Sequence, residues 1–257
     1  MEQEMQIEGK VAIVTGGASG LGEACVRELH ALGAKVAIFD LSVKKGLSLQ
    51  NELTEDAIFV KADVTSPVSI SKAVDFISDK YKRVDININC AGIAIAEKTI
   101  NREGAHTFET FKKVIDVNLL GTFNTLRLCA AEMAQNQNGP DQENGVIINT
   151  SSVAAQDGQK GQLAYSASKG GVASMTLPIS RDLARDKIRC CAVAPGLFLT
   201  PLFESLGEDV CDNLARNVLF PRRLGKPKEF AQLVIDIIKN PYLNGELIRL
   251  DGGIRLP

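Results

Sequence analysis

Short apolar runs rich in β-branched residues alternate along this chain with longer segments of helical periodicity. The apolar runs predict seven strands, at residues 11–15, 36–39, 57–61, 84–89, 146–151, 188–194 and 247–250. The periodic segments predict helices, at residues 21–32, 44–53, 68–81, 108–134, 162–184 and 229–238. This alternation is typical of βαβ units, and strands that are apolar almost throughout are buried on both faces. The sequence therefore predicts an α/β fold, a doubly wound parallel sheet of seven strands flanked by helices on both faces.

The remaining composition narrows the class of protein. The chain has 257 residues, and no Pro-, Gly- or Ser-rich linker divides it, so we expect one domain over residues 1–257. Segments 94–106, 135–144 and 195–227 have the composition of loops, and the last is long enough to cover a substrate. The net charge of −2 argues against a nucleic-acid partner, which needs a basic surface. No apolar run approaches ~20 residues, so we expect no membrane span.

Cysteine and histidine usage points away from a metal centre and from secretion. The six cysteines are scattered without a Cys-x-x-Cys pair, and the only histidines are His30 and His106, so we predict no metal site. The first ten residues are acidic and lack both the apolar core of a signal peptide and the Arg-rich character of a transit peptide. We therefore expect a cytoplasmic protein, or one of the mitochondrial matrix if the source is eukaryotic.

A glycine-rich turn follows the first predicted strand. The sequence Thr15-Gly16-Gly17-Ala18-Ser19-Gly20-Leu21-Gly22 closes that strand and opens the first helix. Glycines at this place let the backbone turn tightly and approach a pyrophosphate, while the helix N-terminus offers free N–H groups and the positive end of its dipole. An ordinary Gly-rich turn shares the spacing, but the strand–turn–helix context favours a dinucleotide-binding loop.

Asp40 ends the second predicted strand, 18 residues after Gly22. A carboxylate at this place accepts hydrogen bonds from both ribose hydroxyls and repels a 2′-phosphate. Neither the glycine loop nor the residues directly beside Asp40 include a Lys or Arg that would bind such a phosphate. We therefore expect NAD rather than NADP; the alternative is that Asp40 is an ordinary strand-end turn residue.

Tyr165 and Lys169 are four residues apart within a predicted helix, so their side chains share one face. A free Tyr has a pKa of ~10 and is rarely ionised at neutral pH, whereas a neighbouring cation stabilises the phenolate. The pair therefore suits Tyr165 to act as a general base toward an alcohol, or as an acid toward a ketone. An exposed Tyr beside a solvated Lys has the same spacing, so the context must decide.

Two further polar residues supply that context. Ser152 follows the fifth predicted strand, 13 residues before Tyr165, at the edge where open α/β sheets bind their ligands. Its hydroxyl suits a role in holding a substrate oxygen while Tyr165 moves the proton, and only the spacing distinguishes it from Ser151. Asn118 stands among apolar residues of the predicted helix 108–134, and a buried amide there needs hydrogen-bond partners.

At these residues the chain resembles the short-chain dehydrogenase/reductase family, along essentially its whole length. The family's glycine loop falls on residues 15–22, and its Asn-x-Ala-Gly motif falls on Asn89-Cys90-Ala91-Gly92, with Cys90 where the family commonly has Asn. Its Asn–Ser–Tyr–Lys tetrad falls on Asn118, Ser152, Tyr165 and Lys169, and its Pro-Gly and downstream Thr fall on Pro195, Gly196 and Thr200. The resemblance implies a single Rossmann-type domain, usually assembled as a homotetramer, that catalyses hydride transfer with a nicotinamide cofactor.

The resemblance also implies how NAD would lie. Ser19 and Leu21 would meet the pyrophosphate, Asp40 the adenosine ribose, and Asp63 with Val64 the adenine. Lys169 would bind the nicotinamide ribose as well as tune Tyr165. The implied cofactor-binding residues are Gly16, Ser19, Gly20, Leu21, Gly22, Asp40, Asp63, Val64, Asn89, Cys90, Ala91, Gly92, Tyr165, Lys169, Pro195, Gly196, Phe198 and Thr200.

Within the family, the resemblance is greatest to enzymes that act on 3-hydroxyacyl-CoA, especially over residues 117–124, 165–178, 194–202 and 244–252. It implies NAD-dependent conversion of a 3-hydroxyacyl-CoA to the 3-oxoacyl-CoA, with Leu202, Phe203 and Leu206 as an apolar lid beside Ser152 and Tyr165; ordinary helix packing is the other reading of these apolar residues. The alternatives are a 3-oxoacyl-carrier-protein reductase, a hydroxysteroid or sugar-alcohol dehydrogenase, and a non-enzymatic redox-sensing scaffold. The scaffold is the least favoured, because all four tetrad residues are retained.

Overall fold

The computed structural model describes residues 5–102, 104–138, 142–201 and 208–256. Seven strands form one parallel sheet, in the order β3-β2-β1-β4-β7-β8-β9. Their bounds are β1 Val11–Thr15, β2 Lys35–Asp40, β3 Ala57–Lys61, β4 Ile86–Asn89, β7 Gly145–Thr150, β8 Ile188–Pro195 and β9 Leu247–Leu250. The predicted fold class is confirmed: the sheet is seven-stranded, parallel and Rossmann-like.

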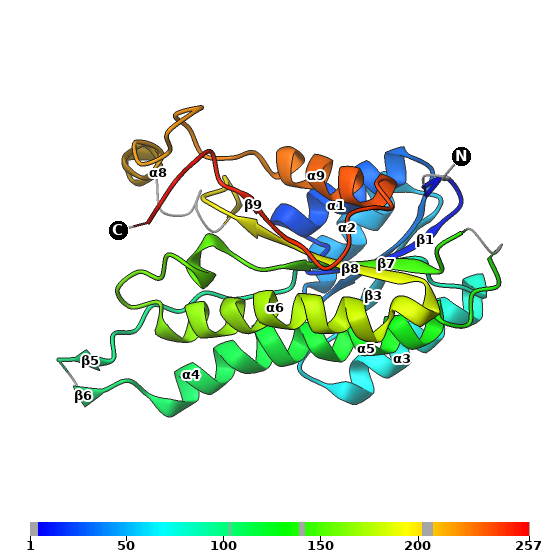
Figure 1. Cartoon of the computed structure of the whole chain (residues 1–257), viewed down its shortest axis with the longest axis horizontal. Helices are drawn as coiled ribbons and strands as arrows, with labels where there is room; N and C mark the ends of the chain where they lie inside the picture. The colour runs from blue at the N-terminus through cyan, green and yellow to red at the C-terminus, as the bar shows by residue number, and fades with distance from the viewer. Residues whose placement is uncertain (1–4, 103, 139–141, 202–207, 257) are drawn as a thin grey trace.

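Helices cover both faces of the sheet (Figure 1). One layer contains α1 (Gly20–Ala31), α2 (Val43–Leu53) and α9 (Pro227–Lys239), and the other contains α3 (Pro67–Tyr81), α4 (Phe108–Ile115), α5 (Gly121–Met133) and α6 (Leu163–Asp182). Side chains alternate along β1, so that Ala12 and Val14 pack into the first layer while Val11 and Ile13 pack into the second. Both cores are apolar, which explains the continuous apolar runs in the sequence.

The predicted helix 108–134 is not continuous, which corrects the sequence prediction. A π-helical turn over Asp116–Leu120 separates α4 from α5. This turn holds the fully buried Asn118, whose amide bonds the chain after β4. A π-turn adds one residue to the helix without breaking it, and such insertions are frequent at functional sites. Apolar periodicity did not reveal it, because a single inserted residue barely alters the pattern.

Two of the predicted loops contain short elements. Segment 94–106 carries an antiparallel pair, β5 (Ile100–Asn101) and β6 (Gly104–Ala105). Segment 195–227 contains α8 (Glu208–Ala215), and its two arms meet where Phe198 forms a parallel bridge with Gly225. Both segments lie at the carboxyl ends of the strands, on the left of Figure 1. A binding site is therefore expected at this edge of the sheet.

Candidate active site

The order of the strands reverses between β1 and β4, and the chain closes tightly at that point. A Cβ atom on Gly16 would lie 2.8 Å from the backbone nitrogen of Ala91 and 3.0 Å from the carbonyl carbon of Cys90. The Ala91 amide donates to the Thr15 hydroxyl at 3.3 Å. Gly16 has a φ of +62°, which also favours glycine. The glycine loop therefore lies directly against the motif that follows β4, at the switch point where open α/β sheets bind dinucleotides.

The glycine loop places the N-terminus of α1 at the carboxyl edge of the sheet. Ser19, which precedes α1, is extended and makes no side-chain capping bond, so the first N–H groups of the helix keep their donors free. Gly22 is needed for close packing, because a Cβ atom there would meet the carbonyl oxygen of Gly16 at 2.2 Å. An unsatisfied N-terminus with glycine backbone beside it suits a phosphate group.

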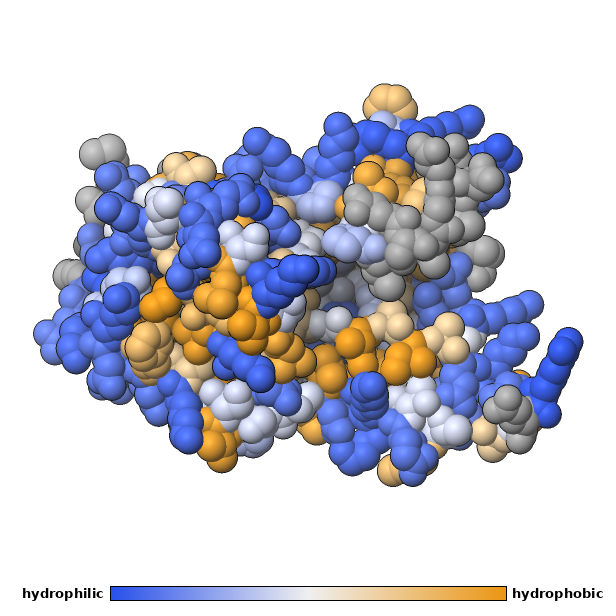
Figure 2. All heavy atoms as spheres, turned by 180° about the vertical axis from the view of Figure 1, so that it is seen from behind, coloured by the Kyte–Doolittle hydropathy of each residue, from blue (hydrophilic) through white to orange (hydrophobic). Residues whose placement is uncertain are grey.

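A cavity of about 510 Å³ opens at this switch point. In the view from behind, the surface is hollowed near the middle of the face (Figure 2). Among the described residues, those lining the cavity are Gly16, Ser19, Gly20, Leu21, Gly22, Phe39, Asp40, Leu41, Ala62, Asp63, Val64, Cys90, Ala91, Gly92, Ile93, Lys113, Val117, Thr200 and Pro201. Twelve of the residues predicted to bind a cofactor belong to this set.

Asp40 ends β2 with its carboxylate on the cavity wall. One carboxylate oxygen accepts the Ala18 backbone N–H at 3.1 Å, and the other accepts the Ser42 N–H at 2.8 Å. Each oxygen keeps lone-pair capacity for a further donor. Asp40 therefore holds the glycine loop in place and still offers two acceptors to a diol.

Asp63 and Val64 follow β3 at the far end of the cavity. The Asp63 carboxylate accepts both the backbone N–H and the hydroxyl of Thr65, at 2.9 and 2.7 Å. The Val64 carbonyl accepts the Asn124 amide at 3.0 Å. Since α5 is tied to this wall by that bond, both helical layers contribute to fixing the cavity.

Asn118 lies in the π-turn with its side chain fully engaged. Its Oδ1 accepts the backbone N–H of Ile93 at 2.8 Å, and its Nδ2 donates to the Ile93 carbonyl at 2.9 Å and to the Ser168 hydroxyl at 3.0 Å. These bonds satisfy a buried amide and tie the chain after β4 to α6. The side chain of Asn118 thus positions the site, and its backbone carbonyl accepts the Thr122 hydroxyl at 2.8 Å.

Ser152 and Ser151 are separated by the direction of their side chains. The Ser151 hydroxyl is buried and donates to the Lys169 carbonyl at 2.9 Å, inside the α6 packing. The Ser152 Oγ accepts the Ala154 N–H at 3.1 Å, and the same hydroxyl lies near enough to the Tyr165 phenol to affect its pKa. Burial raises the pKa of Tyr165, and the Ser152 hydroxyl opposes that shift. The geometry supports Ser152 as the residue that acts with Tyr165.

Lys169 reaches the same place from the next turn of α6. Its Nζ lies 5.8 Å from the centre of the Tyr165 ring and donates to the Thr150 carbonyl at 2.7 Å. Burial lowers the pKa of Lys169 to about 8, and the nearby Cys90 thiol opposes that shift. An ammonium group has three donors, and the carbonyl of Thr150 uses one of them. A buried cation with donors to spare fits a ligand that brings hydroxyl groups, such as a ribose.

Six predicted cofactor residues lie outside the lining of the cavity: Tyr165 and Lys169, described above, and Asn89, Pro195, Gly196 and Phe198. The Asn89 amide donates to Asn87 and Asn149, at 2.7 and 2.9 Å, within the sheet. Pro195 ends β8, and a Cβ atom on Gly196 would lie 2.8 Å from the Cβ of Asp251, so both serve the join between β8 and β9. The Phe198 ring packs edge-to-face on Phe230 in α9, with centroids 6.3 Å apart.

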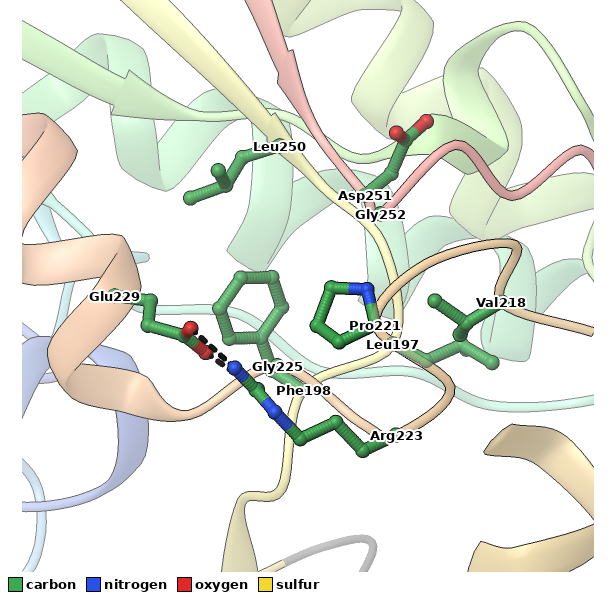
Figure 3. Close-up of a pocket in the computed structure, with 10 residues that line it drawn as sticks. All are labelled: Leu197, Phe198, Val218, Pro221, Arg223, Gly225, Glu229, Leu250, Asp251 and Gly252. Atoms are coloured by element: carbon green, nitrogen blue, oxygen red, sulfur yellow. Dashed lines mark hydrogen bonds and ion pairs between the residues drawn. The ribbon is translucent and has the colours of Figure 1, made fainter. Parts of the chain in front are cut away.

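Phe198 instead lines a second, smaller pocket of about 180 Å³ (Figure 3). Leu197, Val218 and Pro221 also face this pocket, and the ion pair between Arg223 and Glu229 lies across it. The Phe198 side chain therefore anchors segment 195–227 on α9. Leu202, Phe203 and Leu206, predicted as a lid, lie outside the described residues.

Sequence reasoning missed several residues that shape the site. Lys113 on α4 is the one cation among the described lining residues of the cavity, and Ile93 and Val117 line it too. Thr150 holds Lys169 through its carbonyl, so no side-chain pattern could identify that role.

The described residues include no cluster of His, Cys, Asp and Glu suited to a metal ion. They also include no helix long and apolar enough to cross a membrane.

Comparison with known proteins places these features in a family. The family model described as short chain dehydrogenase matches residues 10–210. The 3-hydroxyacyl-CoA dehydrogenase type-2 of Homo sapiens is 54% identical over 97% of this chain and 97% of that protein, and the enzyme of that name from Drosophila melanogaster is 50% identical over 97% and 99%. A crystal structure of 3-hydroxyacyl-CoA dehydrogenase type-2 from Mycobacterium avium superposes with a TM-score of 0.94, at 42% identity and 98% coverage of both chains. The chain therefore belongs to the short-chain dehydrogenase family and is an oxidoreductase enzyme that works with a nicotinamide cofactor.

Proposed function

We propose that this enzyme uses NAD to convert a 3-hydroxyacyl-CoA to the corresponding 3-oxoacyl-CoA, and NADH for the reverse reaction. The observation that carries the chemistry is the buried Lys169 ammonium 5.8 Å from the centre of the Tyr165 ring, with Ser152 near the same phenol. The substrate class rests on relatives that are 50–54% identical over nearly the whole chain and carry the name of that activity.

NAD is favoured over NADP by the charge of the cavity wall. The Asp40 carboxylate offers acceptors to the two hydroxyls of the adenosine ribose and would repel a phosphate on either of them. Both oxygens are already oriented by backbone N–H groups, at 3.1 and 2.8 Å, so the carboxylate is fixed before a ligand arrives. The free N-terminus of α1 would hold the pyrophosphate, and Asp63 with Val64 would border the adenine.

The other end of the dinucleotide would extend toward Tyr165. Thr200 lies on the cavity wall near Gly20, where a built Cβ atom approaches the Thr200 methyl group at 3.6 Å. Lys169 has donors left for the nicotinamide ribose. When bound, NAD supplies the acceptor for the substrate hydride.

The protein's own residues handle the proton. Ser152 would donate a hydrogen bond to the substrate oxygen and fix it beside the Tyr165 hydroxyl. Tyr165, as phenolate, would take the proton from the substrate hydroxyl, and the Lys169 ammonium would stabilise that phenolate. The proton would leave through Lys169 and a water held by the backbone carbonyl of Asn118. In the reverse direction Tyr165 would donate its proton to the ketone.

We also propose that the enzyme assembles as a homotetramer. Leu120, the last residue of the π-turn, and Phe123 in α5 are 51% and 50% exposed, and Leu163 and Leu177 on α6 are exposed as well. Apolar side chains grouped on neighbouring helices indicate a surface that another chain covers. Equilibrium sedimentation, which gives the mass of the assembly, would test this. We predict that Phe123→Glu lowers that mass. A substitution in β5 (Ile100–Asn101), away from these helices, should leave it unchanged.

A substrate and cofactor panel tests the proposed activity. Turnover of acetoacetyl-CoA, an acetoacetyl thioester of acyl carrier protein, a ketosteroid and a simple ketone is measured with NADH and with NADPH. We expect the highest kcat/KM for acetoacetyl-CoA with NADH. Preference for the carrier-protein thioester with NADPH, or for the steroid, would overturn the proposed substrate and favour one of the alternative dehydrogenases.

A further inference from the structure

Two buried side-chain oxygen atoms have no hydrogen-bond partner in the part of the chain that the structure describes. They are the Oε1 atom of Gln162 and the Oγ atom of Ser166. Gln162 is the N-cap of α6 and Ser166 lies in its first turn, on the helix that also carries Tyr165 and Lys169. Buried polar groups are nearly always paired, so an exception points to a partner that the folded chain itself does not supply.

Gln162 lies on the face of α6 that carries the catalytic side chains. It precedes Tyr165 by three residues and Lys169 by seven, and these steps bring side chains to one side of a helix. Along this face Lys169 comes nearest the proposed nicotinamide ribose, Tyr165 follows one turn away, and Gln162 lies a further turn beyond. Gln162 is also absent from the described lining of the dinucleotide cavity. The ligand that it meets is therefore the substrate rather than the dinucleotide.

The chain after β4, at residues 93–97, runs alongside this end of α6. Asn118 joins the first residue of that segment to Ser168 of α6, through bonds of 2.8 and 3.0 Å. The last residue forms a parallel bridge with Gln162 and donates its backbone N–H to the carbonyl before it at 2.8 Å. Tyr165 lies between these two junctions along the helix. The backbone of Gln162 is therefore fixed beside the site before a substrate binds.

Ser166 differs from Gln162 in what faces its oxygen. A Cβ atom built on Gly158 would lie 2.9 Å from the Ser166 Oγ, so the loop before α6 packs closely against that hydroxyl. The Ser166 oxygen therefore has protein backbone, and no space for a ligand, on that side. Of the two unpaired oxygens, only that of Gln162 is suited to a substrate.

We propose that Gln162 selects thioesters of coenzyme A, because its Oε1 atom accepts a hydrogen bond from the substrate. The donor that fits is the first amide N–H of the pantetheine arm, which follows the thioester sulfur after a short methylene link. The thioester group itself has no donor, and the 3-hydroxyl is engaged by Ser152 and Tyr165 in the proposed reaction. This inference rests on the proposed function, since a steroid or a simple alcohol carries no such N–H.

The selection would work by penalty as much as by attraction. A substrate with the amide N–H pairs an oxygen that is unpaired in the free enzyme. A substrate without it leaves that oxygen buried and unpaired, which is the condition under which a polar site rejects an analogue. Gln162 would therefore act on specificity, while Tyr165 carries the proton.

The test compares two small thioesters that differ at one position. S-acetoacetyl-N-acetylcysteamine carries the amide N–H, and the acetoacetyl thioester of 2-mercaptoethyl acetate has an ester oxygen in its place. With NADH, we expect wild-type kcat/KM to be about 10-fold higher for the amide than for the ester. Gln162→Met keeps the length of the side chain and removes its oxygen, so this ratio should fall to about one. Its kcat/KM for acetoacetyl-CoA should fall about 10-fold.

Control variants separate this role from a structural one. Ser166→Ala removes the other unpaired oxygen and should keep the wild-type ratio. Gln162→Glu keeps an acceptor oxygen and loses the amide donors, so it should still prefer the amide substrate. In Gln162→Met, NADH affinity and the pH dependence of kcat should match wild type. A defect transmitted through Tyr165 would instead shift the pH profile and lower both thioesters alike.

The outcomes distinguish this inference from the proposed function. A wild-type ratio near one would overturn the inference, and that measurement needs no variant to fold. Equal losses for the two thioesters in Gln162→Met would overturn it as well, and the proposed function would stand if wild type reduces acetoacetyl-CoA efficiently. Wild-type enzyme that reduces none of the thioesters would overturn the proposed function, and the selection of thioesters with it.

Discussion

Lys169→Met is the substitution whose effect on stability follows most fully from the structure. The Lys169 side chain is buried, its Nζ bonds the Thr150 carbonyl, and burial lowers its pKa from 10.5 to about 8. At ~1.36 kcal/mol per pH unit, keeping this ammonium charged costs the folded, dinucleotide-free protein about 3 kcal/mol near neutral pH. Methionine has a similar length and carries no charge.

The difference between the pKa of Lys169 in the folded and the unfolded chain sets the pH range in which this cost disappears. Below about pH 8 both the folded and the unfolded chain carry the charge, so the full cost is present. Between about 8 and 10.5 the folded chain has released the proton while the unfolded chain still holds it, so wild-type stability rises with pH. The advantage of Lys169→Met over wild type should therefore shrink by about 2 kcal/mol between pH 7 and pH 9.5.

Urea denaturation followed by circular dichroism, at each pH and without dinucleotide, gives the free energy of unfolding. The lost bond to Thr150 offsets the two curves by a constant amount, and groups that titrate alike in both proteins cancel in the difference. Parallel stability curves for wild type and variant would refute the reasoning. The same variant should have lost most of its activity, since the cation beside Tyr165 is gone.

Three further substitutions, each compared with a matched control variant, test the cavity and Ser152. Asp40→Ser should lower kcat/KM for NAD about 10- to 100-fold and raise the ratio of kcat/KM for NADP to kcat/KM for NAD. Asp40→Asn keeps one acceptor, so its kcat/KM for NAD should fall less. Ser152→Ala should lower kcat about 100-fold; Ser151→Ala should cost about 1 kcal/mol of unfolding free energy and leave kcat within a few-fold of wild type. Gly16→Ala should destabilise the enzyme and abolish NAD binding in a titration. Gly9 also has a positive φ, but nothing lies within 4 Å of a Cβ atom built on it. Gly9→Ala should therefore lower the free energy of unfolding by only about 1 kcal/mol. Equal losses for Gly16→Ala and Gly9→Ala would contradict the crowding argument.

The fold could be predicted because burial leaves a periodic record in the sequence. Strands covered on both faces are apolar throughout, and the alternation of strands and helices fixed the parallel sheet, which the structure confirms. The π-turn at Asp116–Leu120 was missed for the converse reason. One extra residue in a helix keeps the apolar residues roughly in phase, so the apolar pattern gives no sign of it.

Site residues could be predicted from the sequence where they act through their side chains, but not where they act through the backbone. Tyr165, Lys169 and Asp40 could be identified because their chemistry depends on residue type and spacing. Thr150 acts through its carbonyl, and the direction of a side chain such as Phe198 depends on packing against α9, so neither is visible in a pattern. The spacing to Tyr165 favoured Ser152 over Ser151 in the sequence, and the structure adds that the Ser151 hydroxyl enters the α6 packing.

The central claim is that the Tyr165 hydroxyl moves the substrate proton beside a bound nicotinamide, and Tyr165→Phe tests it most directly. Phenylalanine keeps the ring and removes only the oxygen. We predict that NADH binding, followed by its fluorescence, stays within a few-fold of wild type, while single-turnover hydride transfer to acetoacetyl-CoA falls about 10²- to 10⁴-fold. Hydride transfer at the wild-type rate in Tyr165→Phe would contradict the account.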